Sequence, residues 1–260
     1  MTEEKDQNRE PKKKRNPFVG LFRVISSVVS TVITLVLVGC ALVAFLAFTH
    51  PDSTLPPEWN PQARLVVDSE VTLLTMWKLR RAISNPDECR AVLAEAAQMS
   101  VLEPFEVSSA CHVRNRVEVT GVGQARVNSV DTACGTALRL AMWERHGIQP
   151  AAAEILGTQV RQIQQIGSYN CRQVRTTQGT SNAWSTHATA DAIDISGFEL
   201  ADGRQIRLID DWNGQGNFAQ FLRATRDSAC DWFVTTLSPD YNALHADHFH
   251  LQNRGWGTCR

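Results

Sequence analysis

The chain has 260 residues, of which 43% are hydrophobic and 20% charged, with 26 Lys and Arg against 27 Asp and Glu. Residues 1–23 carry a net charge of +3 and residues 24–260 a net charge of −4, so the bulk of the chain lacks the basic footprint of nucleic-acid binding and we expect no nucleic-acid partner. The apolar content is enough to close a core, which excludes a wholly disordered chain.

Residues 24–49 form an apolar stretch of 26 residues without a charged side chain. As a helix this stretch would extend about 39 Å, whereas a bilayer core is about 30 Å thick. A buried core helix is the alternative, and the length argues against it. Secretory signal peptides have a shorter apolar region, so we predict an uncleaved transmembrane helix. The sequence Leu37-Val38-Gly39-Cys40 resembles the lipobox of lipoproteins, but residues 41–48 stay apolar, and lipidation of Cys40 is left open.

Basic side chains gather before the apolar stretch, at Lys12, Lys13, Lys14 and Arg15. Positive charge stays in the cytoplasm. We therefore predict a single-pass inner-membrane protein with residues 1–23 as a cytoplasmic tail and the C-terminal domain in the periplasm. Residues 50–63 contain four prolines and are expected to form a stiff linker. Residues 64–260 are expected to form the globular domain.

Helical patterns dominate the first part of the expected domain and strand patterns the second. We expect helices at residues 75–83, 86–97, 131–146 and 217–226. Alternating or β-branched residues predict strands at 116–120, 160–166, 192–195, 204–209, 233–237 and 248–252. The order of these elements favours an α+β fold whose N-terminal helices pack on a mainly antiparallel sheet.

Six cysteines lie beyond the apolar stretch, and none form a CxxC pair. An oxidising compartment allows them to make up to three disulfides. Fifteen pairings of six cysteines are possible and the sequence does not choose among them. Buried free thiols are the alternative.

Four of the seven histidines lie in two short segments, with His187 in one and His245, His248 and His250 in the other. On a strand, His248 and His250 point to the same face. Asp194 falls among apolar residues in an expected buried strand, where an unpaired carboxylate is costly. Singly, each of these residues is more often structural.

Together, two imidazoles and a carboxylate from His187, Asp194 and His250 form the three-ligand set with an open position that zinc uses in catalysis. Water in that position would become more acidic. We therefore predict a zinc cofactor, although nitrogen-rich ligation favours zinc over other divalent ions only moderately.

Two motifs carry a family resemblance. Residues 185–194, STHATADAID, resemble the SxHxxGxAxD motif of the zinc peptidase superfamily that includes D-alanyl-D-alanine carboxypeptidases, lysostaphin-type endopeptidases and hedgehog proteins. Residues 247–250, DHFH, resemble its closing HxH element. The stretch from Tyr169 through these histidines looks closer still to the bacterial extensin-like C-terminal domain family. Ala190 departs from the motif, which has Gly there, and a positive φ at that position would strain it.

The resemblance implies a role for each matching residue. It makes His187, Asp194 and His250 the zinc ligands and places His248 in the site, where it could stabilise the transition state. For the general base it implies Asp247 or His245, with Asp247 ranked slightly first. Separately, a guanidinium grips carboxylates well, so Arg172 or Arg175 is a candidate to hold a substrate carboxylate, with a structural salt bridge as the alternative.

These expectations combine into a membrane-anchored zinc peptidase that hydrolyses amide bonds in the peptide stems of peptidoglycan. The first rival is a catalytically inactive, zinc-stabilised module that binds the cell wall or a partner protein. The second rival is an envelope scaffold in which the membrane helix and linker matter most.

Overall fold

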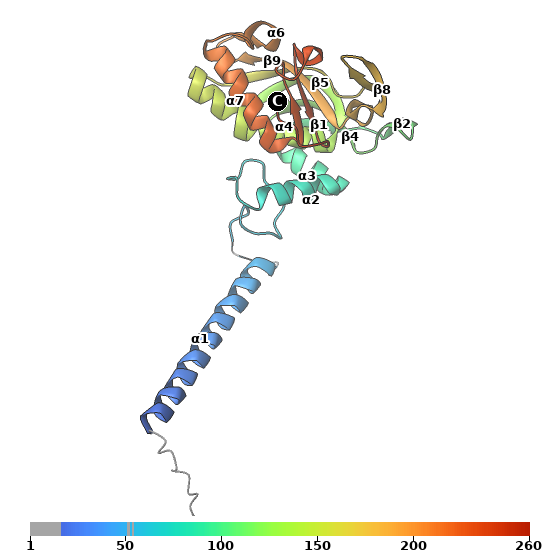
Figure 1. Cartoon of the computed structure of the whole chain (residues 1–260). Coiled ribbons are helices and arrows are strands. Elements are labelled where there is room, and N and C mark those ends of the chain that lie inside the picture. Colours follow the sequence, from blue (N-terminus) through green and yellow to red (C-terminus); the bar gives the residue numbers. More distant parts are fainter. Residues whose placement is uncertain (1–16, 51–52, 54) are drawn as a thin grey trace, which may run out of the picture. The chain divides into compact units, whose positions relative to one another are not determined.

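The computed structural model describes residues 17–260 apart from 51, 52 and 54, with side chains described from residue 25. A boundary between Leu55 and Pro56 divides the chain into two compact units. In the first, helix α1 covers Pro17–Thr49 (Figure 1). Its part Ile25–Thr49 is long and apolar enough to cross a membrane, a test that a signal sequence also passes. Cys40 is exposed on this helix and has a free thiol.

The second unit, Pro56–Arg260, is built on an eight-stranded sheet with the order β1-β4-β5-β6-β9-β12-β11, and β10 also pairs with β9. Neighbouring strands are antiparallel except for the parallel pair β5–β6. The expected α+β class with a mainly antiparallel sheet is therefore confirmed. The strands are β1 Ala97–Val101, β4 Arg116–Val122, β5 Ala125–Ala133, β6 Val160–Gly167, β9 Ala192–Leu200, β10 Gln205–Arg207, β11 Thr235–Leu237 and β12 Phe249–Gln252.

Two separate hairpins and a set of helices complete this unit. The hairpins are β2 Phe105–Ser108 with β3 Cys111–Val113, and β7 Gln173–Thr176 with β8 Gly179–Trp184. The helices are α2 Thr75–Ser84, α3 Pro86–Ala96, α4 Cys134–Trp143, α5 Gln149–Ala151, α6 Leu208–Asp211 and α7 Asn217–Trp232. Short π-helical segments are η1 Glu144–Ile148 and η2 Ala152–Leu156, and 3-10 turns are η3 Thr186–Thr189 and η4 Ala243–His245.

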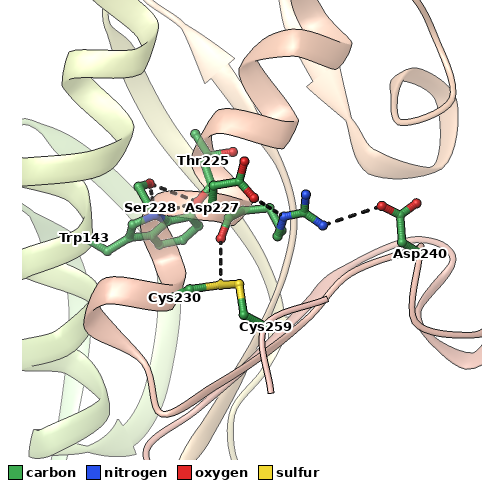
Figure 2. Close-up of a disulfide and its surroundings, with 8 residues drawn as sticks. Trp143, Thr225, Asp227, Ser228, Cys230, Asp240 and Cys259 are labelled. Atoms are coloured by element: carbon green, nitrogen blue, oxygen red, sulfur yellow. Dashed lines mark hydrogen bonds and ion pairs between the residues drawn. A yellow bond between two sulfur atoms is a disulfide. The ribbon is translucent and has the colours of Figure 1, made fainter. Parts of the chain in front are cut away.

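The core lies between the sheet and helices α4 and α7 (Figure 1). Trp143, at the end of α4, is fully buried and stacks edge-on against Phe198 of β9 and Phe249 of β12. Its indole N–H donates to the Thr225 carbonyl and to Ser228 Oγ of α7, each at 3.0 Å (Figure 2). A buried indole N–H needs such a partner, so this residue fixes α7 against the sheet.

Strand alternation decides which side chains face away from this core. Ile193 and Leu251 are buried, and they pair directly in the β9–β12 register. The next pair in that register is Asp194 with His250. Since successive side chains point to opposite faces, this polar pair lies on the face of the sheet opposite the apolar one.

Three disulfides tie the second unit together, and all six cysteines beyond α1 take part. Cys89–Cys134 joins α3 to α4, Cys111–Cys171 joins β3 to the segment before β7, and Cys230–Cys259 joins α7 to the C-terminal residues. The prediction of up to three disulfides is confirmed, and the pairing that sequence left open is now given.

Two expected elements differ from the structure. Residues 131–133 end strand β5 instead of beginning a helix, because Asp131 pairs with Glu118 in the register and forms an ion pair with Arg116. Residues 208–211 form the short helix α6 instead of continuing a strand, since Asp211 accepts a hydrogen bond from the Arg207 N–H and ends the extended run.

The expected linker also overlaps the second unit, which begins at Pro56. Arg81 donates to the carbonyls of Pro61 and Ala63, and Lys78 donates to the carbonyl of Pro57. These bonds hold residues 57–63 against α2. The functional division into tail, membrane helix, linker and domain stays a prediction.

Candidate metal centre

Three predicted ligands converge on one point. His187 comes from η3, Asp194 from β9 and His250 from β12, and one ligand atom from each lies within 4.8 Å of the other two. His187 Nε2 is 3.2 Å from Asp194 Oδ2 and 3.1 Å from His250 Nδ1. His250 Nδ1 is 2.8 Å from Asp194 Oδ1. Two nitrogens and a carboxylate therefore face one another.

The other nitrogen of each imidazole is already engaged. His187 Nδ1 lies 2.7 Å from the Ser168 carbonyl, an acceptor only, so this nitrogen carries the proton. His250 Nε2 lies 3.0 Å from Gln252 Oε1, to which it donates, and Thr186 donates to the same oxygen at 2.8 Å. Such outer partners fix the tautomer of metal-binding histidines. The remaining nitrogens, His187 Nε2 and His250 Nδ1, present lone pairs toward each other.

This donor arrangement fits a divalent cation. Two lone pairs 3.1 Å apart beside a carboxylate repel unless a proton or a cation lies among them. Burial by itself raises the pKa of Asp194, but when protons occupy the facing nitrogens, hydrogen bonds and charge interactions from His187 and His250 outweigh burial and hold that pKa below its usual value. Asp194 is therefore ionised, and the set of two imidazoles and one carboxylate is one that zinc accepts with a position left open.

His245 and His248 lie beside these three residues without belonging to the group. Their ring centroids are 5.3 Å apart, and that of His245 is 5.7 Å from that of His250. His245 donates from Nδ1 to Asn242 Oδ1 at 2.8 Å, which leaves Nε2 with a lone pair. Burial and the neighbouring histidines lower the pKa of His245 to about 4, so its ring is neutral near pH 7.

Asp247 does not face the cluster. It is exposed, and its Oδ1 accepts from His248 Nδ1 at 2.8 Å. This contact orients the His248 ring so that Nε2 lies 3.7 Å from Asp194 Oδ1. Asp247 does not line the groove over the cluster, whereas His245 and His248 do. The geometry therefore favours His245 over Asp247 as the proton acceptor, and both assignments stay predictions.

Asp194 and His250 line a groove of about 1080 Å³, and His187 is buried behind them. Arg172, Arg175 and Arg254 line it, and Asp194 is its one acidic lining residue among those the structure describes. Burial, and after it the charge of Arg175, lowers the pKa of Arg172. Arg175 has no ion pair among the described residues, so the salt-bridge alternative does not hold for it. Positive charge beside the cluster suits an anionic ligand.

The loop that carries His187 is held by two devices. Ser185 Oγ accepts from the His187 N–H at 3.3 Å and caps the turn. Ala190 ends the turn with φ 51° and is the only non-glycine residue with positive φ in the described chain. The Ala at the motif's Gly position therefore does occupy the left-handed region, and Thr136 Oγ1 holds its carbonyl at 2.7 Å.

Structure and sequence agree on most of the site. Asp194, His250, the two further histidines and both predicted arginines line one groove, and His187 lies buried beside Asp194 and His250. Sequence reasoning missed Gln252 and the Ser168 carbonyl. Gln252 follows His250 by two residues on the same strand, and that spacing places it on the same face. No side-chain pattern signals a carbonyl.

The fold and the cluster define an α+β protein with a metal-capable His–Asp–His group in the floor of a basic groove. The chain belongs to the family described as Extensin-like protein C-terminus, whose sequence model matches residues 87–260. This range contains the cluster, the groove and the three disulfides. Comparison with curated proteins and with solved structures found no significant match.

Proposed function

We propose that this protein is a membrane-anchored, zinc-dependent peptidase that hydrolyses amide bonds in peptidoglycan peptide stems. The observation that carries the proposal is the convergence of His187, Asp194 and His250. In each imidazole the second ring nitrogen donates its N–H to a fixed acceptor. The proposed kinship with zinc peptidases rests on the two sequence motifs that supply these ligands.

The residues around the cluster have distinct parts in this proposal. A divalent ion held there would polarise a substrate carbonyl and lower the pKa of a bound water. His245 is oriented by Asn242 with its Nε2 free, so it accepts the proton of the attacking water and returns it to the leaving amine. His248, when protonated, donates from Nε2 to the oxygen on which charge develops.

The groove supports a peptide that ends in or carries free carboxylates. Arg172 and Arg175 lie on the groove wall, and a guanidinium binds a carboxylate through two parallel hydrogen bonds. Peptide stems of peptidoglycan bear such carboxylates.

We further propose that α1 anchors the protein in the inner membrane with the second unit in the periplasm. Its apolar length and the basic residues before it support this topology. The three disulfides suit an oxidising compartment. Alkaline extraction should leave the full chain in the membrane fraction, and external protease should reach the second unit only after the outer membrane is opened. Protection of that unit in spheroplasts would contradict the topology.

The decisive experiment measures zinc content and muropeptide cleavage for the full-length protein in mild detergent. We expect about one zinc per chain and shortened stems for the wild type, and loss of both for His250→Ala. The matched control is His112→Ala, because the buried Nδ1 of His112 has no hydrogen-bond partner among the residues that the structure describes. Zinc binding without any cleavage would instead support the zinc-stabilised binding module.

A further inference from the structure

Three large aromatic side chains are exposed within the groove that holds the cluster. Trp256 is 98% exposed, Trp184 is 48% exposed and Tyr241 is 44% exposed, and all three line the groove. Single exposed apolar residues are ordinary on protein surfaces. Two indoles in the wall of one polar, basic groove are a different case, since each could cover a ligand's flat face.

Trp256 lies on a loop whose two ends are fixed. At one end the Asn253 N–H donates to the Asp191 carbonyl at 2.8 Å. At the other end Cys259 is bonded to Cys230 of α7 (Figure 2), and the Thr236 N–H of the edge strand β11 donates to the Thr258 carbonyl at 2.8 Å. The loop therefore holds its position while it presents the indole to solvent.

Gly255 lets the backbone beside Trp256 lie close to the groove. Gly255 has φ 130° and Gly257 has φ 71°, in the region that favours glycine. A Cβ at Gly255 would come within 2.6 Å of Thr235 Oγ1 and 2.7 Å of Gln252 Nε2. The loop thus packs directly against the residue that supports His250, with no room for a side chain between them.

Trp184 belongs to the β7–β8 hairpin and is also anchored. It ends β8, and the next residue, Ser185, donates its N–H to the Arg172 carbonyl at 3.0 Å. The neighbouring Cys171 is bonded to Cys111 of β3. Trp256 is therefore three residues from a disulfide, and the hairpin that ends at Trp184 begins beside another.

The chemistry of the groove selects one kind of occupant. An indole face in a polar groove matches a rigid ring with an apolar C–H face and a polar rim, which is the form of a pyranose. The unpaired Arg175, with Arg172 beside it, matches carboxylates. A glycan strand that still carries its stem peptides has both properties, with ring faces from the sugars and free carboxylates from the stems. A peptide stem without sugars has the carboxylates but lacks the ring faces.

We propose that Trp184 and Trp256 form a glycan-binding subsite, so that the protein recognises peptide stems still attached to their glycan strand. This inference rests on the proposed function, and it identifies the substrate class: glycan-linked stems in preference to free peptides.

The test measures binding by the full-length protein in mild detergent, in the His250→Ala background so that no cleavage occurs. Three probes are used: peptidoglycan glycan strands freed of stem peptides, neutral chitin oligosaccharides, and free stem peptide. We expect the glycan strands to bind and to shift the tryptophan fluorescence, and the chitin oligosaccharides to bind more weakly. Trp256→Ala and Trp184→Ala should each weaken glycan binding by about fivefold, with stem-peptide binding unchanged.

The matched control is Trp77→Ala, because Trp77 of α2 is also 48% exposed but lies outside the groove. Its variant should bind glycan as the parent does. Absent glycan binding, equal losses for Trp77→Ala and Trp256→Ala, or an equal loss of peptide binding would each overturn the proposal. Because binding is read without catalysis, a protein that binds glycan strands but never cleaves stems would refute the peptidase and leave the subsite standing.

Discussion

Ala190 has a strained backbone, and its replacement by glycine tests how much that strain costs in the loop that carries His187. Its φ of 51° puts an L-residue in the left-handed region, at a cost of about 1–2 kcal/mol. Substitution by glycine removes that cost. It also loses a buried methyl worth about 0.8 kcal/mol and costs about 0.5–1 kcal/mol in backbone entropy. We therefore expect Ala190→Gly to change the free energy of unfolding by less than about 1 kcal/mol.

Ala188 provides the matched comparison two residues away. Both alanines are fully buried, but Ala188 lies within η3 and has no positive φ. Ala188→Gly therefore carries both losses without relief of strain, and should destabilise the protein by about 1.3–1.8 kcal/mol. The difference between the two variants isolates the strain and should be about 1–2 kcal/mol.

Urea unfolding followed by tryptophan fluorescence gives both values. All seven tryptophans lie in residues 56–260, so the signal reports on the second unit within the full chain. Chelator in the buffer keeps metal binding out of the measurement. Equal destabilisation by the two substitutions would refute the assignment of strain to Ala190.

Three further predictions test other parts of the structure. Replacing both Cys230 and Cys259 by serine should lower the free energy of unfolding by about 3.5 kcal/mol, because the bond closes a loop with a sequence separation of 29 residues; urea unfolding measures the change. Gln252→Ala removes the acceptor of the His250 N–H and should weaken zinc binding about 10–100-fold in a competition titration with a chelator. Burial lowers the pKa of His146 below its ordinary value of about 6.5, so the stability it contributes is full above pH 6.5 and is lost as pH falls through the folded pKa; in His146→Gln that part of the acid loss should be absent.

Each of these has a control and a contradicting result. A reduced wild type that unfolds like the oxidised one would show that the disulfide adds no stability. Gln205→Ala, at an exposed glutamine of β10, should leave zinc affinity unchanged, and an equal loss there would remove the special role of Gln252. If wild type and His146→Gln differ in stability by a constant amount from pH 7.5 to pH 5, the neutral form of His146 is not favoured by folding.

The sequence allowed the central strands and the ligands to be predicted because both follow simple spacing. Apolar alternation marked β9 and β12, and Asp194 and His250 fell on their polar faces. The junction between β5 and α4 could not be predicted, since Ala133 gives no side-chain cap and the first helical N–H groups are instead served from elsewhere, as when Cys134 N–H donates to the Asn115 carbonyl. The hairpin β7–β8 was missed because its residues are largely exposed and show no alternation.

The register that pairs Asp194 with His250 is the same one that pairs the core residues Ile193 and Leu251. The geometry of the site therefore depends on the packing of the core. A slip of β12 by one residue against β9 would turn His250 inward, push Leu251 into solvent and separate His250 from Asp194. An insertion in either strand would therefore disturb both the core and the candidate site, whereas the surrounding loops can change in length without doing so. Among relatives, we expect the residues that line the groove to vary more than the three candidate metal ligands.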